Sequence, residues 1–409
     1  MSLSTSLSGV QAAQTGIDTV GNNIANVNTT GFKSSVADFA DLYGGAVQST
    51  PGQGVFTAGL AQSFTEGSVS QTGKPLDVAI AGNGFFQLQG SSGVVYSRDG
   101  SFQLDKDGHL VNGAGAVVMG FAAPPSGGGA SAGPLQPIQI SSASLPASAT
   151  SKLTIDVNLP STDAAINTTA TPFSLNNAKS YDESTTTSVY DSLGTSLSLT
   201  TYFTRVSGSG SPNQWQTHYS LVSAAGNLIT SGAGPTLVFN SSGQLTSGSG
   251  TITAGSLPDG ASPLNIALGF TGSSLSDLPF GVNALSSDGS GGGEFNGIQI
   301  AANGVVTGQY SNGATRDFGT IALANFANPQ GLVPMTGNLW AASIASGPAT
   351  TGAPTTAGLG QLESGALEGS NVDLSTQLVN LIVAQQAYQA NVQGINIDQQ
   401  NFQRLLTIQ

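Results

Sequence analysis

The sequence predicts a mainly β protein with terminal α-helices, folded as a nested multidomain chain. At both ends, apolar residues recur at steps of three and four residues, which is the spacing of a coiled-coil helix face. Between the ends, short runs of β-type residues are separated by turn dipeptides such as Asp-Gly, a pattern typical of hairpins. We therefore expect terminal coiled-coil helices, an inner β domain built from two segments, and an inserted outer β domain.

The N-terminal helix is expected within residues 1–30. Positions that step by three and four from residue 3 to residue 27 are apolar at seven of eight places, with Ser6 as the exception. This segment is rich in glycine and serine, which lower helix propensity, so the helix needs partners to be stable. The residues expected at its assembly interface are Leu3, Leu7, Val10, Ile17, Val20, Ile24 and Val27.

The C-terminal helix is expected within residues 370–409. The same stepping pattern runs from residue 374 to residue 406 and is broken only by Gln385 and Gln399. Asn371 or Asp373 can cap the start of this helix, because a side-chain oxygen there accepts from a free backbone N–H. The residues expected at its assembly interface are Leu374, Leu378, Leu381, Tyr388, Val392, Ile395, Phe402 and Leu406.

The apolar faces of the two helices favour packing between chains. One isolated helix pair would be marginal, because the backbone entropy of ordering both segments exceeds the gain from burying their apolar side chains. Outside the apolar seams, charges are almost absent: Asp18 is the only acid before residue 30, and Asp373, Asp398 and Arg404 are the only charges after residue 370. Such faces can meet neighbours without burying an ion. An internal helical hairpin packed on the β domains stays the alternative.

The segments between the helices divide by composition. Residues 31–74 and 360–369 are expected to be linkers, and the first of these is rich in Gly, Ser and Gln with scattered aromatics. Residues 75–147 and 283–359 share one style of short strands and tight turns, so we assign them to the inner β domain. Residues 148–282 are rich in Ser and Thr and poor in charge, and we assign them to the outer β domain.

Composition excludes several classes of function. Only 31 of 409 residues are charged and the net charge is −13, so a nucleic-acid partner, which needs a basic face, is not expected. The chain has no cysteine and two histidines, so we expect no metal site, no cofactor and no catalytic residues, and hence no enzyme. The start of the chain lacks a basic region followed by an apolar stretch, and no apolar run is long enough to span a bilayer. We therefore expect no cleaved signal peptide and no membrane insertion.

Two groups of residues resemble functional sites but favour structural roles. Asp105, Lys106, Asp107 and Gly108 match the opening of a calcium loop, yet the later acidic ligands are missing, so a hairpin turn is expected. The two histidines, His109 and His218, are expected to be structural or exposed. No spaced pair of carboxylates supports a carbohydrate-cleaving enzyme.

Several segments together resemble the bacterial flagellar rod and hook axial protein family. The segments are SLSGVQAAQ at 6–14, GNNIANVNTTGFK at 21–33, PLDVAIAGNGFF at 75–86, ANFANPQGL at 324–332, GALEGSNVDL at 365–374 and LVNLIVAQQAY at 378–388. The resemblance covers about 1–121 and 294–409, whereas residues 148–282 match only in size and style. Rod proteins of the family are usually shorter, so the inserted segment favours the hook branch.

The resemblance implies a structural subunit that polymerises with identical copies into a helical tube. In this family the tube is a flexible universal joint that passes motor torque to the filament, and the terminal helices line its core. It implies export by the flagellar type III apparatus without signal cleavage, and a place outside the cell on the hook, which is attached to the basal body. The implied further partners are the distal rod, hook cap and hook–filament junction proteins.

Two alternatives stay open at this point. Within the family, the chain could be a distal rod or hook-junction subunit. From another class, a secreted β-rich adhesin would explain the abundance of Ser, Thr and Gly but not the two terminal heptad patterns. Electron micrographs separate these possibilities, because a hook subunit forms tubes and an adhesin stays dispersed.

Overall fold

The structure is a computed structural model that describes residues 3–42, 52–91, 93–123, 133–206, 213–255 and 257–407, with the backbone alone described for 405–407. The chain divides into two compact units. Unit 1 comprises Met1–Ser142, Gly297–Gln309 and Thr315–Gln409. Unit 2 comprises Ala143–Asn296 and Tyr310–Ala314. The domain boundaries expected from the sequence stay a prediction.

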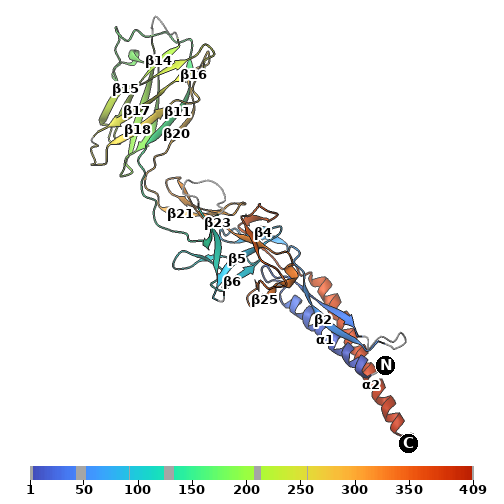
Figure 1. Ribbon diagram of the computed structural model, residues 1–409. Coiled ribbons are helices and arrows are strands. Elements are labelled where there is room, and N and C mark those ends of the chain that lie inside the picture. The colour runs from blue at the N-terminus through green and yellow to red at the C-terminus, as the bar shows by residue number, and fades with distance from the viewer. Residues whose placement is uncertain are drawn as a thin grey trace. The chain divides into compact units, whose positions relative to one another are not determined.

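Both terminal helices are present and belong to unit 1. Helix α1 (Leu3–Ala25) and helix α2 (Leu374–Thr407) pack against each other, as the blue and red ribbons of Figure 1 show. Of the two candidate caps, Asp373 takes the role, since the Thr376 backbone N–H donates to Asp373 Oδ1 at 2.6 Å. No helix in the described part of the chain is both long and apolar enough to cross a membrane.

The prediction of an irregular linker over residues 31–74 is wrong. Strands β1 (Ser35–Asp41) and β2 (Val55–Gln62) form an antiparallel hairpin that packs on α1. The buried Asn23 amide of α1 ties the hairpin down, because it donates to Ser35 O at 2.7 Å and accepts from Ser35 N at 2.9 Å. Ladder bonds and packing on the helix thus override the loop-like composition.

Residues 360–369 also form strands where a linker was expected. Strand β28 (Gln361–Ser364) pairs with β4 (Val78–Ala81), and β29 (Ala366–Glu368) pairs with β3 (Val69–Gln71), both antiparallel. These pairings join the segment before α2 to the segment after the β1–β2 hairpin. The backbone groups of the expected linker are therefore hydrogen-bonded to strand partners almost 300 residues away in the sequence.

One large sheet holds most of the remaining strands of unit 1. Its path runs β21-β22-β23-β9-β5-β6-β26-β25 and joins the two predicted segments, because β9 pairs with β23 and β5 pairs with β24. The strands are β5 (Phe85–Gly90), β6 (Gly93–Ser97), β7 (Gln103–Leu104), β8 (Leu110–Val111), β9 (Val117–Ala122), β10 (Leu135–Pro137), β21 (Phe295–Ile300), β22 (Val305–Tyr310), β23 (Thr315–Ile321), β24 (Leu323–Asn325), β25 (Val333–Met335), β26 (Leu339–Ala341) and β27 (Thr350–Gly352); a 3₁₀ turn, η2, spans Pro329–Gly331. An aromatic cluster that includes Phe85, Tyr96 and Trp340 fills part of the core.

Unit 2 is a sandwich of two five-stranded sheets. The first has the order β12-β13-β14-β15-β16, and the second has the order β17-β18-β11-β19 with β20 also paired to β11. Buried side chains from both sheets, Leu199, Trp215 and Ile266 among them, form one hydrophobic core. The strands are β11 (Lys152–Pro160), β12 (Glu183–Tyr190), β13 (Ser196–Arg205), β14 (Gln214–Val222), β15 (Leu228–Phe239), β16 (Leu245–Ser247), β17 (Ser249–Ala254), β18 (Leu264–Gly269), β19 (Ser274–Ser276) and β20 (Gly281–Ser287), with a 3₁₀ turn, η1, at Ala178–Ser180.

Candidate assembly interface and the ion cluster behind it

The expected interface residues of α1 are only partly covered within one chain. Leu3 and Leu7 are 54% and 49% exposed, and the five that follow them in the predicted seam are half-buried. The residues of α1 that are fully buried are small or polar: Ser6, Ala12, Ala13, Thr19 and Asn23. The heptad pattern therefore located the helix, but it did not identify the face that the chain buries against itself.

The apolar residues of α2 are still more exposed. Leu374, Leu378 and Phe402 are exposed, while Leu381, Tyr388, Val392 and Ile395 are half-buried, and the side chain of Leu406 lies outside the described residues. Four further apolar residues outside the predicted seam are also exposed: Val379, Ile382, Val383 and Ile397. So much apolar surface along one helix is typical of a surface that contacts another protein.

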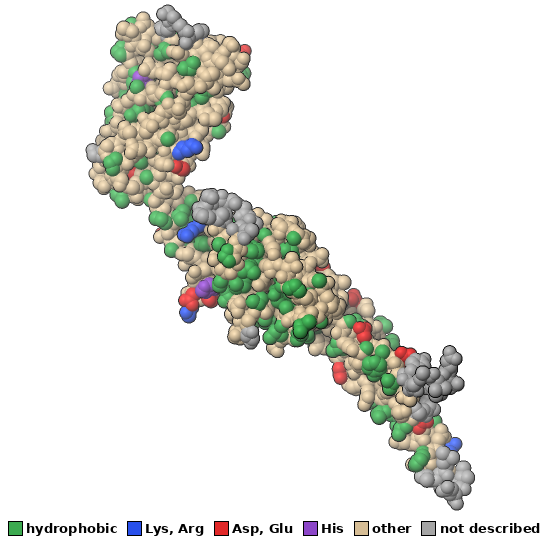
Figure 2. Space-filling view, in the orientation of Figure 1, with side chains coloured by type: hydrophobic (Ala, Val, Ile, Leu, Met, Phe, Trp, Pro, Cys, Tyr) green, Lys and Arg blue, Asp and Glu red, His purple; other side chains and the backbone are tan. Residues whose placement is uncertain are grey.

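The two helices approach each other through small residues. A Cβ added at Gly9 would lie 2.4 Å from Asn391 Oδ1, and one added at Gly16 would lie 3.8 Å from the Ala384 Cβ. Beside this contact, α1, α2 and the β1–β2 hairpin enclose a groove of about 700 Å³. Among the described residues, its lining includes Ala12, Phe39 and Val383 but no charged side chain. Figure 2 likewise shows few charged side chains over the helices on the face it presents.

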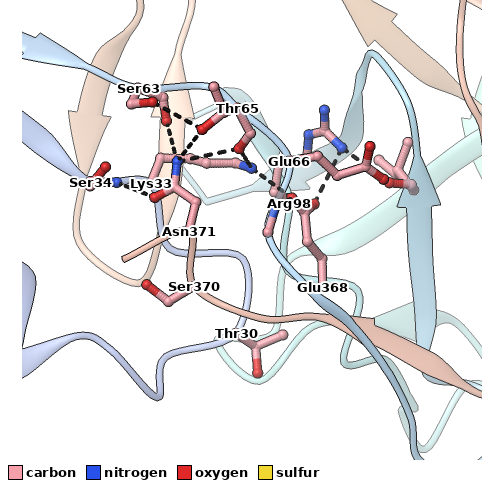
Figure 3. A network of polar contacts seen from close by, with 12 residues as sticks. Thr30, Lys33, Ser34, Ser63, Thr65, Glu66, Arg98, Glu368, Ser370 and Asn371 are labelled. Atoms are coloured by element: carbon pink, nitrogen blue, oxygen red, sulfur yellow. Dashed lines mark hydrogen bonds and ion pairs between the residues drawn. The ribbon is translucent and has the colours of Figure 1, made fainter. Parts of the chain in front are cut away.

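A buried cluster of three charged side chains lies near the end of α1 and the start of α2 (Figure 3). Lys33, Arg98 and Glu368 are 1%, 4% and 0% exposed, and we call them the ion cluster. Lys33 Nζ donates to Glu368 Oε1 at 2.6 Å and to Thr65 O at 2.7 Å. Arg98 Nη1 donates to Glu368 Oε2 at 3.2 Å, and the Gly67 N–H donates to Glu368 Oε1 at 2.9 Å. Both oxygens of the buried carboxylate are thereby satisfied.

The ion cluster joins the segment that follows α1 to the segment that precedes α2. The Gly31 N–H donates to Glu368 O at 2.7 Å. Asn371, which does not cap α2, accepts from the Ser34 N–H at 2.7 Å and donates to Ser63 O at 2.8 Å, as Figure 3 shows. The amide of Asn371 therefore ties the segment before α2 to residues that precede it by 337 and 308 positions in the sequence.

Burial shifts the protonation equilibria of the two cations. Desolvation lowers the pKa of Lys33, and the hydrogen bond and charge of Glu368 oppose this effect only in part. Desolvation also lowers the pKa of Arg98, against the attraction of Glu368 and Glu66. Two buried cations thus share one buried carboxylate. This cluster could not be predicted from the sequence, because nothing in a local pattern pairs residues 335 positions apart.

The other residues considered from sequence have structural surroundings. Asp105 Oδ1 accepts from the backbone N–H groups of Asp107 and His109 at 2.8 Å, which confirms a turn between β7 and β8. His218 stacks on Phe173 with ring centroids 4.0 Å apart, and burial lowers the pKa of the His218 ring. Both histidines are therefore explained by packing and turn formation.

Family models of flagellar axial proteins match most of the chain. Residues 3–33 match the flagella basal body rod protein model, and residues 79–168 match the D1 domain of the flagellar hook proteins FlgE, FlgF and FlgG. Residues 158–290 match the D2 domain of flagellar basal body protein FlaE, and residues 363–408 match the C-terminal model of the rod proteins FlgEFG.

Full-length relatives narrow the family to the hook. The chain is 42% identical to the flagellar hook protein FlgE of Salmonella typhimurium and 41% identical to that of Escherichia coli K12, each over all of both chains. The crystal structure of Helicobacter pylori hook protein FlgE2 has a similar fold, with a TM-score of 0.56 at 16% identity, over 72% of this chain and 99% of that one. The two full-length relatives favour the hook over the rod, junction and adhesin alternatives. The chain belongs to the flagellar hook protein family and is a structural subunit of the flagellar hook.

Proposed function

We propose that α1 and α2 form the central interface between identical subunits in a tubular hook. The observation that carries this proposal is the exposed apolar surface of the two helices, including Leu3, Leu378 and Phe402, in a chain with few charges. Burying such side chains against neighbours contributes about 1.5–3 kcal/mol for each one that becomes fully covered. The uncharged groove between the helices and the β1–β2 hairpin can take such a side chain without burying an ion.

The ion cluster supports the same proposal from inside the chain. It fixes the segment that follows α1 and the segment that precedes α2, with Lys33 eight residues after the end of α1 and Glu368 six residues before the start of α2. A load applied to the paired helices passes to the sheets of unit 1 through these contacts and through the β3–β29 pairing. On this view the cluster makes helices and sheets move as one body.

The complete role that we propose is that of a universal joint that passes motor torque to the filament, without catalysis. Unit 2 suits contacts that slip as the tube bends, because the hydroxyls of its many Ser and Thr residues exchange partners with water at low cost, whereas salt bridges resist sliding. The partners on this proposal are further copies of the chain, the distal rod, the hook cap and the hook–filament junction proteins. The chain would leave the cell through the flagellar type III apparatus and act outside it.

A charge placed in the predicted seam of α2 tests the interface. Leu378→Asp puts an unpaired carboxylate where a neighbour is expected to pack, at a cost of several kcal/mol per contact. We expect no tubes in electron micrographs and no sedimenting polymer, while thermal unfolding of the sheets, followed by tryptophan fluorescence, is unchanged. Gln389→Asp, at an exposed polar position of α2, is the matched control and should polymerise. If Leu378→Asp assembles as readily as this control, the helices do not form the interface.

A further inference from the structure

Two carboxyl groups meet in unit 2, and they come from different sheets of the sandwich. Asp191 lies in the turn between β12 and β13, and Asp259 lies in the turn between β17 and β18. The two side chains are in contact. The backbone N–H of Thr195 donates to Asp191 Oδ1 at 2.9 Å. The two turns also touch through Thr195 Oγ1, which donates to Asp259 Oδ2 at 2.9 Å.

One of the four carboxyl oxygens has no donor. Asp191 is 0% exposed, and its Oδ1 accepts from the backbone N–H groups of Leu193 at 2.8 Å and Thr195 at 2.9 Å. Its Oδ2 is buried and receives no N–H or O–H hydrogen bond from the described residues. Asp259, in contrast, is exposed, and its Oδ1 accepts from the Ala261 N–H at 3.2 Å. The buried oxygen of Asp191 is therefore left without a donor among the described residues.

The charge of this pair is not compensated by a nearby side chain. Neither Asp191 nor Asp259 has an ion pair with Lys, Arg or His within the part of the chain that the structure describes. Two carboxylates in contact repel each other unless a proton or a cation lies between them. Asp191 Oδ1 and both oxygens of Asp259 already accept hydrogen bonds, so the buried Asp191 Oδ2 is the oxygen left to bind a cation.

We propose that Asp191 and Asp259 bind a divalent cation of the Ca²⁺ class, and that this cation links the two sheets of unit 2. Carboxylate oxygens are the ligands that such hard cations prefer, and the exposed side of Asp259 leaves room for water to complete the coordination. With only two protein carboxylates, the affinity belongs in the weak range of extracellular sites, about 0.1–1 mM. Mg²⁺ should bind more weakly, because it gives up its water reluctantly.

Calorimetry of the full chain tests this site. In 10 mM CaCl₂, compared with EDTA at equal ionic strength, the unfolding transition of unit 2 should rise by about 3–5 °C for a dissociation constant near 1 mM. Hydrogen exchange should slow in the turns 191–195 and 257–262. The same concentration of MgCl₂ should give a smaller shift.

Two variants locate the effect. Asp259→Asn keeps the size of an exposed side chain and should abolish both the shift and the slowed exchange. Asp107→Asn should keep both the Ca²⁺-dependent shift in unfolding temperature and the slowed exchange. It lies in the Asp105–His109 turn, where the acidic and imidazole groups also lie within 4.8 Å of one another. If Ca²⁺ gives no shift and acidification stabilises unit 2 instead, the pair shares a proton and the proposal is overturned. The proposal is also overturned if the Ca²⁺-dependent shift in unfolding temperature persists in Asp259→Asn but disappears in Asp107→Asn.

Discussion

The ion cluster of unit 1 gives the sharpest test of how the chain ends are held. Glu368→Gln keeps the shape of the side chain but removes the charge of the carboxylate that forms the ion pairs with Lys33 and Arg98, while the charge of Glu66 still acts on both cations. All three side chains are almost fully buried, so water cannot replace the lost partner. Removing one partner of a buried ion pair costs about 3–5 kcal/mol. Lys33 can release its proton, because burial already lowers its pKa, so we expect the lower end of this range.

A loss of about 3 kcal/mol corresponds to a fall of about 6–12 °C in the unfolding temperature of a unit of this size. Thermal and urea unfolding are followed by the fluorescence of Trp340, whose Nε1 donates to Gln62 Oε1 at 2.7 Å in unit 1. The second tryptophan, Trp215, lies in unit 2 and should report an unchanged transition. The variant should also assemble poorly, since the segment that follows α1 and the segment that precedes α2 are no longer fixed to each other.

An exposed ion pair provides the control. Lys106 Nζ lies 2.7 Å from Asp107 Oδ2, and both side chains are more than half exposed, so Asp107→Asn should change stability by less than about 0.5 kcal/mol. The double variant Lys33→Met, Glu368→Gln should lose less stability than the sum of the single variants, because each single change leaves an uncompensated group. If Glu368→Gln matches the control, or if the single effects simply add, the cluster does not hold the chain ends together.

Two further predictions concern unit 2. Burial lowers the pKa of His218, so the stability of unit 2 should be complete above the ordinary histidine pKa near 6.5 and should fall as the pH drops from that value through the lower pKa of the folded state. His218→Phe keeps the stack on Phe173 and should remove the difference between the urea midpoints that Trp215 reports at pH 5 and at pH 7.5. An equal pH dependence in the variant would show that His218 is not its cause. Leu145 and Gly293 exchange two backbone hydrogen bonds of 2.8 and 3.0 Å, so residues 146–292 can be replaced by a short Gly/Ser linker. Micrographs of this deletion should still show tubes, with altered curvature and bending stiffness. A complete loss of tubes would place unit 2 in the assembly core.

Much of the fold follows from local sequence patterns. The steps of three and four residues predict both terminal helices, and α1 and α2 begin and end within the expected ranges. Turn chemistry likewise predicts the turn at Asp107-Gly108, because that dipeptide suits a tight connection between strands. The family motifs at both ends identify the hook family. Each of these signals depends on residues within a few positions of one another.

What the sequence alone determined is therefore where helices, turns and family motifs lie; what only the tertiary structure decided is which groups meet. The face of α1 that is buried carries Ser6 and Asn23, because close packing against α2 and a hairpin selects small and hydrogen-bonding side chains. Glu368 meets Lys33 from 335 residues away. The meeting of Asp191 and Asp259 across two sheets is of the same kind. Periodicity reports the local conformation of a segment, whereas burial and charge pairing depend on partners that only the folded chain brings together.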